Sequence, residues 1–92
     1  MAGEVVDNPA ESRFELPVEG DVAVAYYRRV GERLVLTHTE VPEALSGQGI
    51  GSRLAKGVFE AIGARGGKAV TQCPFMTSYV QRHPEFADLV AD

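Results

Sequence analysis

Tryptophan is absent from this 92-residue chain, cysteine occurs once and histidine occurs twice. Because Cys73 has no second cysteine to pair with, an internal disulfide is excluded, and the few possible metal ligands are too scattered to predict a zinc site. No run approaches the roughly eighteen apolar residues that cross a membrane. The first residues also lack the basic start and the apolar stretch of a secretory signal. These absences predict a cytoplasmic protein without a structural metal.

Positive charge is also scarce. Lys and Arg total 9 and Asp and Glu total 13, which leaves a net charge of −4. Broad binding to nucleic acid or to an anionic membrane requires clustered cations, so neither partner is expected, although a small local anion site is still allowed. The length predicts a single domain over residues 1–92. We expect this domain to be monomeric, with the polar segment 1–11 partly mobile.

Alternating apolar residues predict strands in the first half of the chain. The expected strands cover residues 13–18, 22–29 and 33–41. Glu19-Gly20-Asp21 and Gly31-Glu32 are suited to the tight turns between them, because glycine and aspartate tolerate the positive φ that such turns require. Connections this short predict an antiparallel three-strand meander.

The second half changes to helical spacing. Ile50, Leu54, Val58 and Ile62 recur every four residues, which predicts an amphipathic helix that ends at the Gly66-Gly67 pair. Residues 68–73 then resemble a short buried strand, parallel to its neighbour because a crossover helix precedes it. A shorter helix over 75–83 and a tail over 85–90 complete the chain. The order β-β-β-α-β-α predicts an α+β fold with a mixed sheet.

Gly47, Gly49 and Gly51 cluster where the long helix begins. A helix N-terminus offers unpaired N–H groups and the positive end of the helix dipole, and glycines let an anion such as pyrophosphate approach them. The alternative is a flexible connection that happens to be rich in glycine. The loop is not a P-loop, since no lysine precedes Ser52, and its glycine spacing does not match a dinucleotide fingerprint.

The stretch "VPEALSGQGIGSRL" resembles the acetyl-CoA-binding motif of the GNAT superfamily of acyltransferases, written Arg/Gln-x-x-Gly-x-Gly/Ala. Ser46, Gly49 and Gly51 stand at its fixed places, and Ser46 departs from the usual Arg or Gln. Together with "CPF" and "YVQRHPEFADLV", the motif is similar to the compact YjdJ-type N-acetyltransferase domains. The resemblance covers roughly residues 13–90.

This resemblance implies that acetyl-CoA is the cofactor and that its pyrophosphate lies on the glycine loop. The pantetheine arm would lie between the strands over 33–41 and 68–73, where a backbone N–H near Val41 polarises the thioester. The residues implied in cofactor binding are Val41, Ser46, Gly47, Gln48, Gly49, Ile50, Gly51 and Ser52.

His38 and Glu40 are the candidate bases that would take a proton from an amine. They lie two residues apart on one strand and so share a face, which we expect to be that of Leu34 and Leu36. Imidazole titrates near neutral pH, which favours His38. The alternative is that His38 covers the edge of the core and that Glu40 is merely solvated.

Cys73 ends the parallel strand, where it could form an acetyl-cysteine or could simply be a small buried residue. No Lys or Arg is next to it in the chain to stabilise a thiolate, so we expect direct transfer with Cys73 lining the acetyl site. Tyr79 resembles the superfamily tyrosine that protonates the CoA thiolate, and the alternative is a core aromatic.

The function predicted is transfer of an acetyl group from acetyl-CoA to an amine by direct attack. The acceptor could be a small molecule or a protein. One alternative is a non-catalytic module that binds CoA or acyl-CoA. Another is a structural protein whose glycine loop is only a connection.

Overall fold

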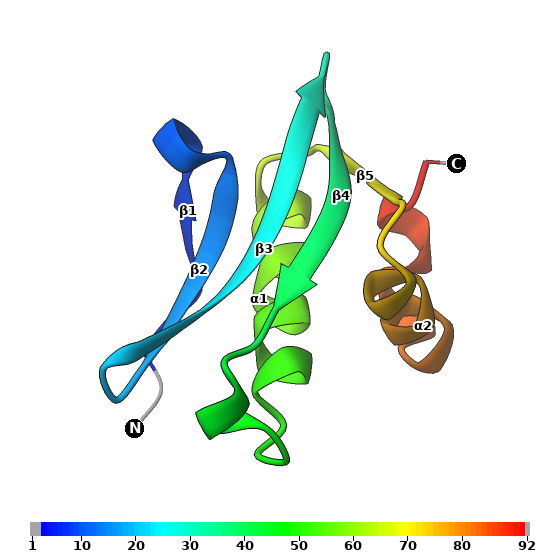
Figure 1. Cartoon of the computed structure of the whole chain (residues 1–92). Coiled ribbons are helices and arrows are strands. Elements are labelled where there is room, and N and C mark those ends of the chain that lie inside the picture. The colour runs from blue at the N-terminus through cyan, green and yellow to red at the C-terminus, as the bar shows by residue number, and fades with distance from the viewer. Residues whose placement is uncertain (1–2, 92) are drawn as a thin grey trace.

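A computed structural model describes residues 3–91 as one five-stranded sheet with two α-helices (Figure 1). The elements are β1 (Val6–Asn8), η1 (Pro9–Glu11), β2 (Arg13–Val18), β3 (Asp21–Val30), β4 (Arg33–Glu40), η2 (Glu43–Leu45), α1 (Ile50–Ala64), β5 (Lys68–Thr71), α2 (Pro74–Arg82) and η3 (Pro84–Leu89), where η is a 3-10 helix. The strand order is β1-β2-β3-β4-β5, antiparallel except for the parallel pair β4 and β5. The predicted α+β fold, with its meander, crossover helix and parallel strand, is confirmed. No helix within residues 3–91 is long and apolar enough to cross a membrane.

The two tight turns that connect the antiparallel strands β2, β3 and β4 form where the sequence predicts them. Glu19 and Gly20 both have positive φ, at 47° and 90°, and connect β2 to β3 as a two-residue turn. Gly31 has a φ of 61° and, with Glu32, makes the matching turn from β3 to β4. Positive φ at such positions gives the turn the same hand as the twist of the strands.

One strand was not predicted. Val6–Asn8, within the polar opening segment, pairs antiparallel with β2 at the edge of the sheet. Its side chains hold it in place, because the Asp7 carboxylate accepts hydrogen bonds from the Tyr27 hydroxyl at 2.6 Å and from Arg65 at 3.0 Å. Burial and the nearby Asp7 together raise the pKa of Tyr27 to about 12. Contacts distant in sequence therefore make a strand of a segment that has no alternating pattern.

Helix α1 ends as its glycines predict. Gly66 takes a φ of 69° and donates its N–H to the carbonyl of Gly63, while Gly67 donates to the carbonyl of Ile62. These two bonds form a Schellman motif, which stops the helix and frees the chain to enter β5. Strand β5 then pairs with β4 in the register Leu34 to Ala69.

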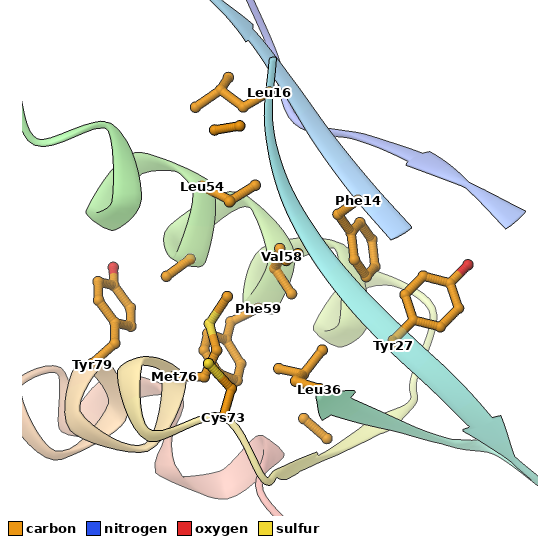
Figure 2. Close-up of a cluster of buried hydrophobic side chains, with 14 of the residues drawn as sticks. Phe14, Leu16, Tyr27, Leu36, Leu54, Val58, Phe59, Cys73, Met76 and Tyr79 are labelled. Carbon is orange, nitrogen blue, oxygen red and sulfur yellow. The ribbon is translucent and has the colours of Figure 1, made fainter. Parts of the chain in front are cut away.

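The core lies between one face of the sheet and the two α-helices (Figure 2). Its largest fully buried side chains are Phe14, Phe59, Leu16, Leu34, Leu36, Leu54, Ile62, Met76 and Val58. The apolar stripe of α1 supplies one side of this contact together with Met76 and Tyr79 of α2, and the inward residues of β2, β3 and β4 supply the other side. We call the other side of the sheet the open face; it carries Arg13, Glu15, Val24, Tyr26, His38 and Glu40.

Candidate active site

A β-bulge in β4 sets the geometry of the candidate site. Tyr26 of β3 pairs with His38, but the next residue, Tyr27, pairs with Leu36, so Thr37 is an extra residue in β4. An extra residue reverses the alternation of side chains along the rest of the strand. Every residue after Thr37 therefore points to the face opposite the one that simple alternation predicts.

The prediction of which face of the sheet the two candidate bases occupy is therefore wrong. His38 and Glu40 were expected to follow Leu34 and Leu36 onto the core side, but their side chains lie on the open face and are 61% and 59% exposed. Thr39 takes the core side instead. The sequence shows that the apolar run ends at Leu36 and that four polar residues follow, which indicates an exposed strand end but does not indicate which face His38 takes.

On the open face, His38 and Glu40 form a pair. The Nε2 atom of His38 lies 3.2 Å from Oε2 of Glu40. The imidazole ring also stacks on Tyr26, with the ring centres 6.3 Å apart and the planes 16° from parallel. The stack and the carboxylate orient the imidazole at the end of β4, as a proton acceptor requires.

Strands β4 and β5 part just beyond Leu36. Its carbonyl accepts the N–H groups of both Gln72 and Cys73, at 3.1 and 2.9 Å. No backbone hydrogen bond joins β4 to the chain after β5 beyond this point within the described residues. The backbone of Thr37–Glu40 is thus unpaired on its β5 side, as expected for a strand edge that could receive a ligand.

Cys73 lies at this split, with its side chain 5% exposed. Its sulfur is 3.4 Å from the Thr39 hydroxyl, the single polar contact of that thiol among the described residues. No cation or imidazole touches the sulfur there, since the bulge turns His38 to the other face. Apart from its place as the N-cap residue of the nine-residue helix α2, Cys73 therefore has the surroundings of a packed thiol, with no cationic side chain of residues 3–91 beside it to stabilise a thiolate.

The glycine loop joins β4 to α1 and is anchored at both ends. Leu45 of η2 and Ile50 of α1 are 5% and 4% exposed, whereas the residues between them are exposed. Gly47 and Gly49 adopt positive φ, at 78° and 71°. Left-handed backbone of this kind favours glycine, so both positions have a conformational reason for their residue type.

The N-terminus of α1 is uncapped. Gly49 is the N-cap residue and has no side chain with which to cap the helix, and the first turn contains no acidic residue. The N–H groups of Ile50, Gly51 and Ser52 find no acceptor within the described residues. Three free donors at the positive end of a 15-residue helix form a site suited to an anion such as a phosphate.

Gly51 has a different reason to be glycine. A Cβ atom at this position would lie 2.9 Å from Cζ of Phe75, which is too close for carbon atoms. Phe75 belongs to the first turn of α2, so the absent side chain lets the two helices meet beside the split. Only two of the three loop glycines therefore serve the loop conformation, and the third serves helix packing.

The remaining expected cofactor residues flank these elements. Val41 follows β4 directly and packs partly against the core. The N–H of Ser46 already donates to the Glu43 carbonyl at 3.0 Å, so this residue could offer a ligand only its exposed hydroxyl. The side-chain amide of Gln48 reaches the Ala44 carbonyl at 3.5 Å.

Tyr79 is buried in an aromatic cluster. Its ring lies 4.1 Å from the His83 ring centre and 6.1 Å from those of both Phe59 and Phe86. Figure 2 shows the hydroxyl directed away from α2 and toward α1, where it has no hydrogen-bond partner among the described residues. Burial, followed by the charges of Glu85 and Glu60, raises the pKa of Tyr79.

Comparison with known proteins identifies the family. The family described as GCN5-related N-acetyl-transferase matches residues 13–89. Protein NATD1 of Mus musculus is 42% identical over 75 residues, which cover 78% of this chain and 68% of the mouse protein. Protein NATD1 of Homo sapiens is 42% identical over 65 residues, which cover 70% of this chain and 58% of the human protein. The chain thus spans less than two thirds of the human relative.

A solved structure agrees in fold. The NMR solution structure of a GCN5-like protein from Staphylococcus aureus superposes with a TM-score of 0.71 and 26% sequence identity, over 96% of this chain and 87% of that one. The uncapped helix and the parted strands described above fall within the segment that the family match covers. This chain belongs to the GCN5-related N-acetyltransferases, and the resemblance found in its sequence is confirmed.

Proposed function

We propose that this protein transfers the acetyl group of acetyl-CoA directly to an amine. The observation that carries the proposal is the adjacency of two features that CoA requires. The uncapped N-terminus of α1 suits its pyrophosphate, and the parted edge of β4 suits the amide-rich pantetheine arm. Only the twelve-residue segment from Val41 to Ser52 connects them, so one ligand could occupy both.

The chain's own backbone would hold the donor. The N–H groups of Gly49, Ile50, Gly51 and Ser52 would bind the diphosphate, since donors to charged oxygens form the stronger hydrogen bonds. The unpaired edge of β4 would pair with pantetheine as a neighbouring strand does. An N–H near Val41 would then polarise the thioester carbonyl.

Transfer requires two proton movements. The amine nitrogen attacks the thioester carbon, so that a C–N bond forms and the C–S bond breaks. The proton leaving the amine goes to the imidazole of His38, which Glu40 orients from 3.2 Å. The CoA thiolate takes a proton from the Tyr79 hydroxyl, which is protonated at neutral pH, although its raised pKa makes it a weaker acid than an ordinary phenol.

Two measurements test this function. Acetyl-CoA at millimolar concentration should raise the melting temperature, since a ligand that binds only the folded state stabilises it. Release of free thiol in the presence of an amine panel should then show turnover. Absence of a thermal shift would reject CoA binding altogether. A shift without thiol release from any amine would leave a non-catalytic CoA-binding module as the function.

A further inference from the structure

We propose that His83 is a positioning residue for the transfer, because its imidazole ring holds the Tyr79 ring in the orientation that proton donation to the CoA thiolate requires. This inference rests on the proposed acetyl transfer and deepens it. The two rings lie face to face, with their centres 4.1 Å apart and their planes 22° from parallel. No other pair of rings within residues 3–91 is as close.

Tyr79 depends on ring contacts for its orientation. Hydrogen bonds hold the hydroxyls of the other two tyrosines, since Arg13 donates to that of Tyr26 at 3.3 Å and that of Tyr27 donates to Asp7 at 2.6 Å. The Tyr79 hydroxyl has no such bond among the described residues. A side chain whose tip is not held can adopt any staggered χ1 orientation that its surroundings allow. The direction of this phenol is therefore set by what packs against its ring.

The three rings around Tyr79 differ in how closely they pack against it. The ring centres of Phe59 and Phe86 are both 6.1 Å from that of Tyr79, whereas His83 makes direct face contact. Phe59 is wholly buried in the core, but the side chain of His83 is 39% exposed. The nearest ring is therefore also one that can be replaced without opening a cavity in the core.

Contacts other than Tyr79 fix His83 in place. His83 is the C-cap residue of α2, where its N–H donates to the Val80 carbonyl and its own carbonyl accepts the N–H of Phe86, both at 3.1 Å. Pro84 follows and disfavours helical backbone at His83, so α2 ends there. The Nδ1 atom of the imidazole also lies 3.7 Å from Oε2 of Glu85. A residue that orients another must itself be held by its surroundings, and His83 meets this requirement.

The acidity of Tyr79 makes its alignment important. Burial, followed by the charges of Glu85 and Glu60, raises the pKa of this phenol, and Arg82 opposes them. A weak acid assists the departing thiolate only when it is aligned with it as the C–S bond breaks. Loss of the His83 ring should therefore slow the chemical step. Binding of acetyl-CoA should not change, because the backbone groups proposed to hold it belong to β4 and the start of α1.

Two variants of His83 test the role of its ring, assayed with the amine that gives the fastest release of thiol. His83→Ala removes the ring and should lower kcat by roughly 10- to 100-fold, with the KM for acetyl-CoA unchanged. His83→Phe keeps a ring at the same place and should recover most of the loss. The alkaline limb of the pH–rate profile that reports Tyr79 should disappear in His83→Ala and persist in His83→Phe.

Phe86→Leu is the matched control, since it removes a more distant ring from the same cluster. It should lower the free energy of unfolding but leave kcat close to the wild-type value. Because His83 acts through the phenol, His83→Ala combined with Tyr79→Phe should be no slower than Tyr79→Phe alone. The inference is wrong if Phe86→Leu slows turnover as much as His83→Ala, if His83→Phe recovers nothing, or if the double variant is slower.

A second measurement needs no turnover. The hydroxyl of Tyr79 is directed toward α1 (Figure 2). Nuclear Overhauser contacts between the Tyr79 ring and the side chains of α1 should weaken in His83→Ala and persist in His83→Phe. Unchanged contacts in His83→Ala would overturn the inference, and the proposed function would stand if acetyl-CoA binds and thiol is released. If the wild-type protein releases no thiol with any amine, the proposed function has failed, and these contacts alone decide whether His83 orients Tyr79.

Discussion

The hydroxyl of Thr39 lies 3.4 Å from the thiol of Cys73, on the core side of the place where β4 and β5 part. This contact exists because the bulge at Thr37 turns Thr39 inward. A hydroxyl beside a thiol can share a hydrogen bond with it but supplies no positive charge. The Thr39 hydroxyl therefore adds no positive charge that would stabilise a thiolate at Cys73, which argues against Cys73 as a nucleophile in acetyl transfer.

Cys73 is expected to be dispensable for transfer. Cys73→Ala should retain turnover within about tenfold, because direct attack uses no enzyme nucleophile. Mass spectrometry of the wild-type protein incubated with acetyl-CoA alone should show no stoichiometric acetylation. Rapid acetylation at Cys73 that an amine then discharges would instead establish a covalent intermediate.

Gly51 is expected to respond to substitution through Phe75. Gly51→Ala should be less stable than Gly63→Ala in the same helix by about 1–3 kcal/mol, since only the first brings a new methyl group to 2.9 Å from the ring. Chemical denaturation measures both. Phe75→Leu introduced into Gly51→Ala should recover most of the loss. Equal stability of the two alanine variants would show that the packing contact is unimportant.

His38→Gln is expected to lower kcat by about 10²-fold with little change in acetyl-CoA affinity, as for loss of a general base. The limb of the pH–rate profile that reports the general base should disappear with it. The side chain is 61% exposed, so the free energy of unfolding should change by no more than about 0.5 kcal/mol. Full activity in this variant would transfer the role of base to Glu40.

Tyr79→Phe keeps the ring in its aromatic cluster and removes only the hydroxyl. We expect slower turnover and unchanged stability, because the hydroxyl has no hydrogen-bond partner to lose among the described residues. A raised pKa keeps the phenol protonated into the alkaline range, so the wild-type rate should fall only at high pH. That alkaline limb should be absent from the variant. Identical pH–rate profiles would assign Tyr79 to the core alone.

Tyr27 is expected to make stability depend on alkaline pH. Its pKa rises from 10 to about 12 on folding, so the folded state holds the phenol proton more tightly. The resulting stabilisation is complete below pH 10 and is lost as the pH rises toward 12, at about 1.4 kcal/mol per pH unit. Urea denaturation across this range should show the loss in the wild type, and Tyr27→Phe should show a shallower dependence. If the free energies of unfolding of the wild type and Tyr27→Phe fell in parallel as the pH rises, the loss of stability could not be assigned to Tyr27.

Local pattern determined most of the fold. The alternation Phe14, Leu16, Val18 and the four-residue spacing along α1 are properties of neighbouring residues, so the sequence predicts both element types correctly. The turn at Gly20 and the helix stop at Gly66 are also local, because positive φ favours glycine wherever the rest of the chain lies. The positive-φ positions of the glycine loop at the start of α1 are likewise determined by local sequence.

Tertiary structure decided the details of the candidate site. The bulge at Thr37 depends on how β4 pairs with β3, and no residue of β4 alone encodes which face His38 takes. Gly51 is explained by Phe75, which lies 24 positions away in sequence. The edge strand β1 depends on Asp7 reaching Tyr27 and Arg65. Each of these features arises from contact between segments distant in sequence, and such contacts exist only once the chain has folded.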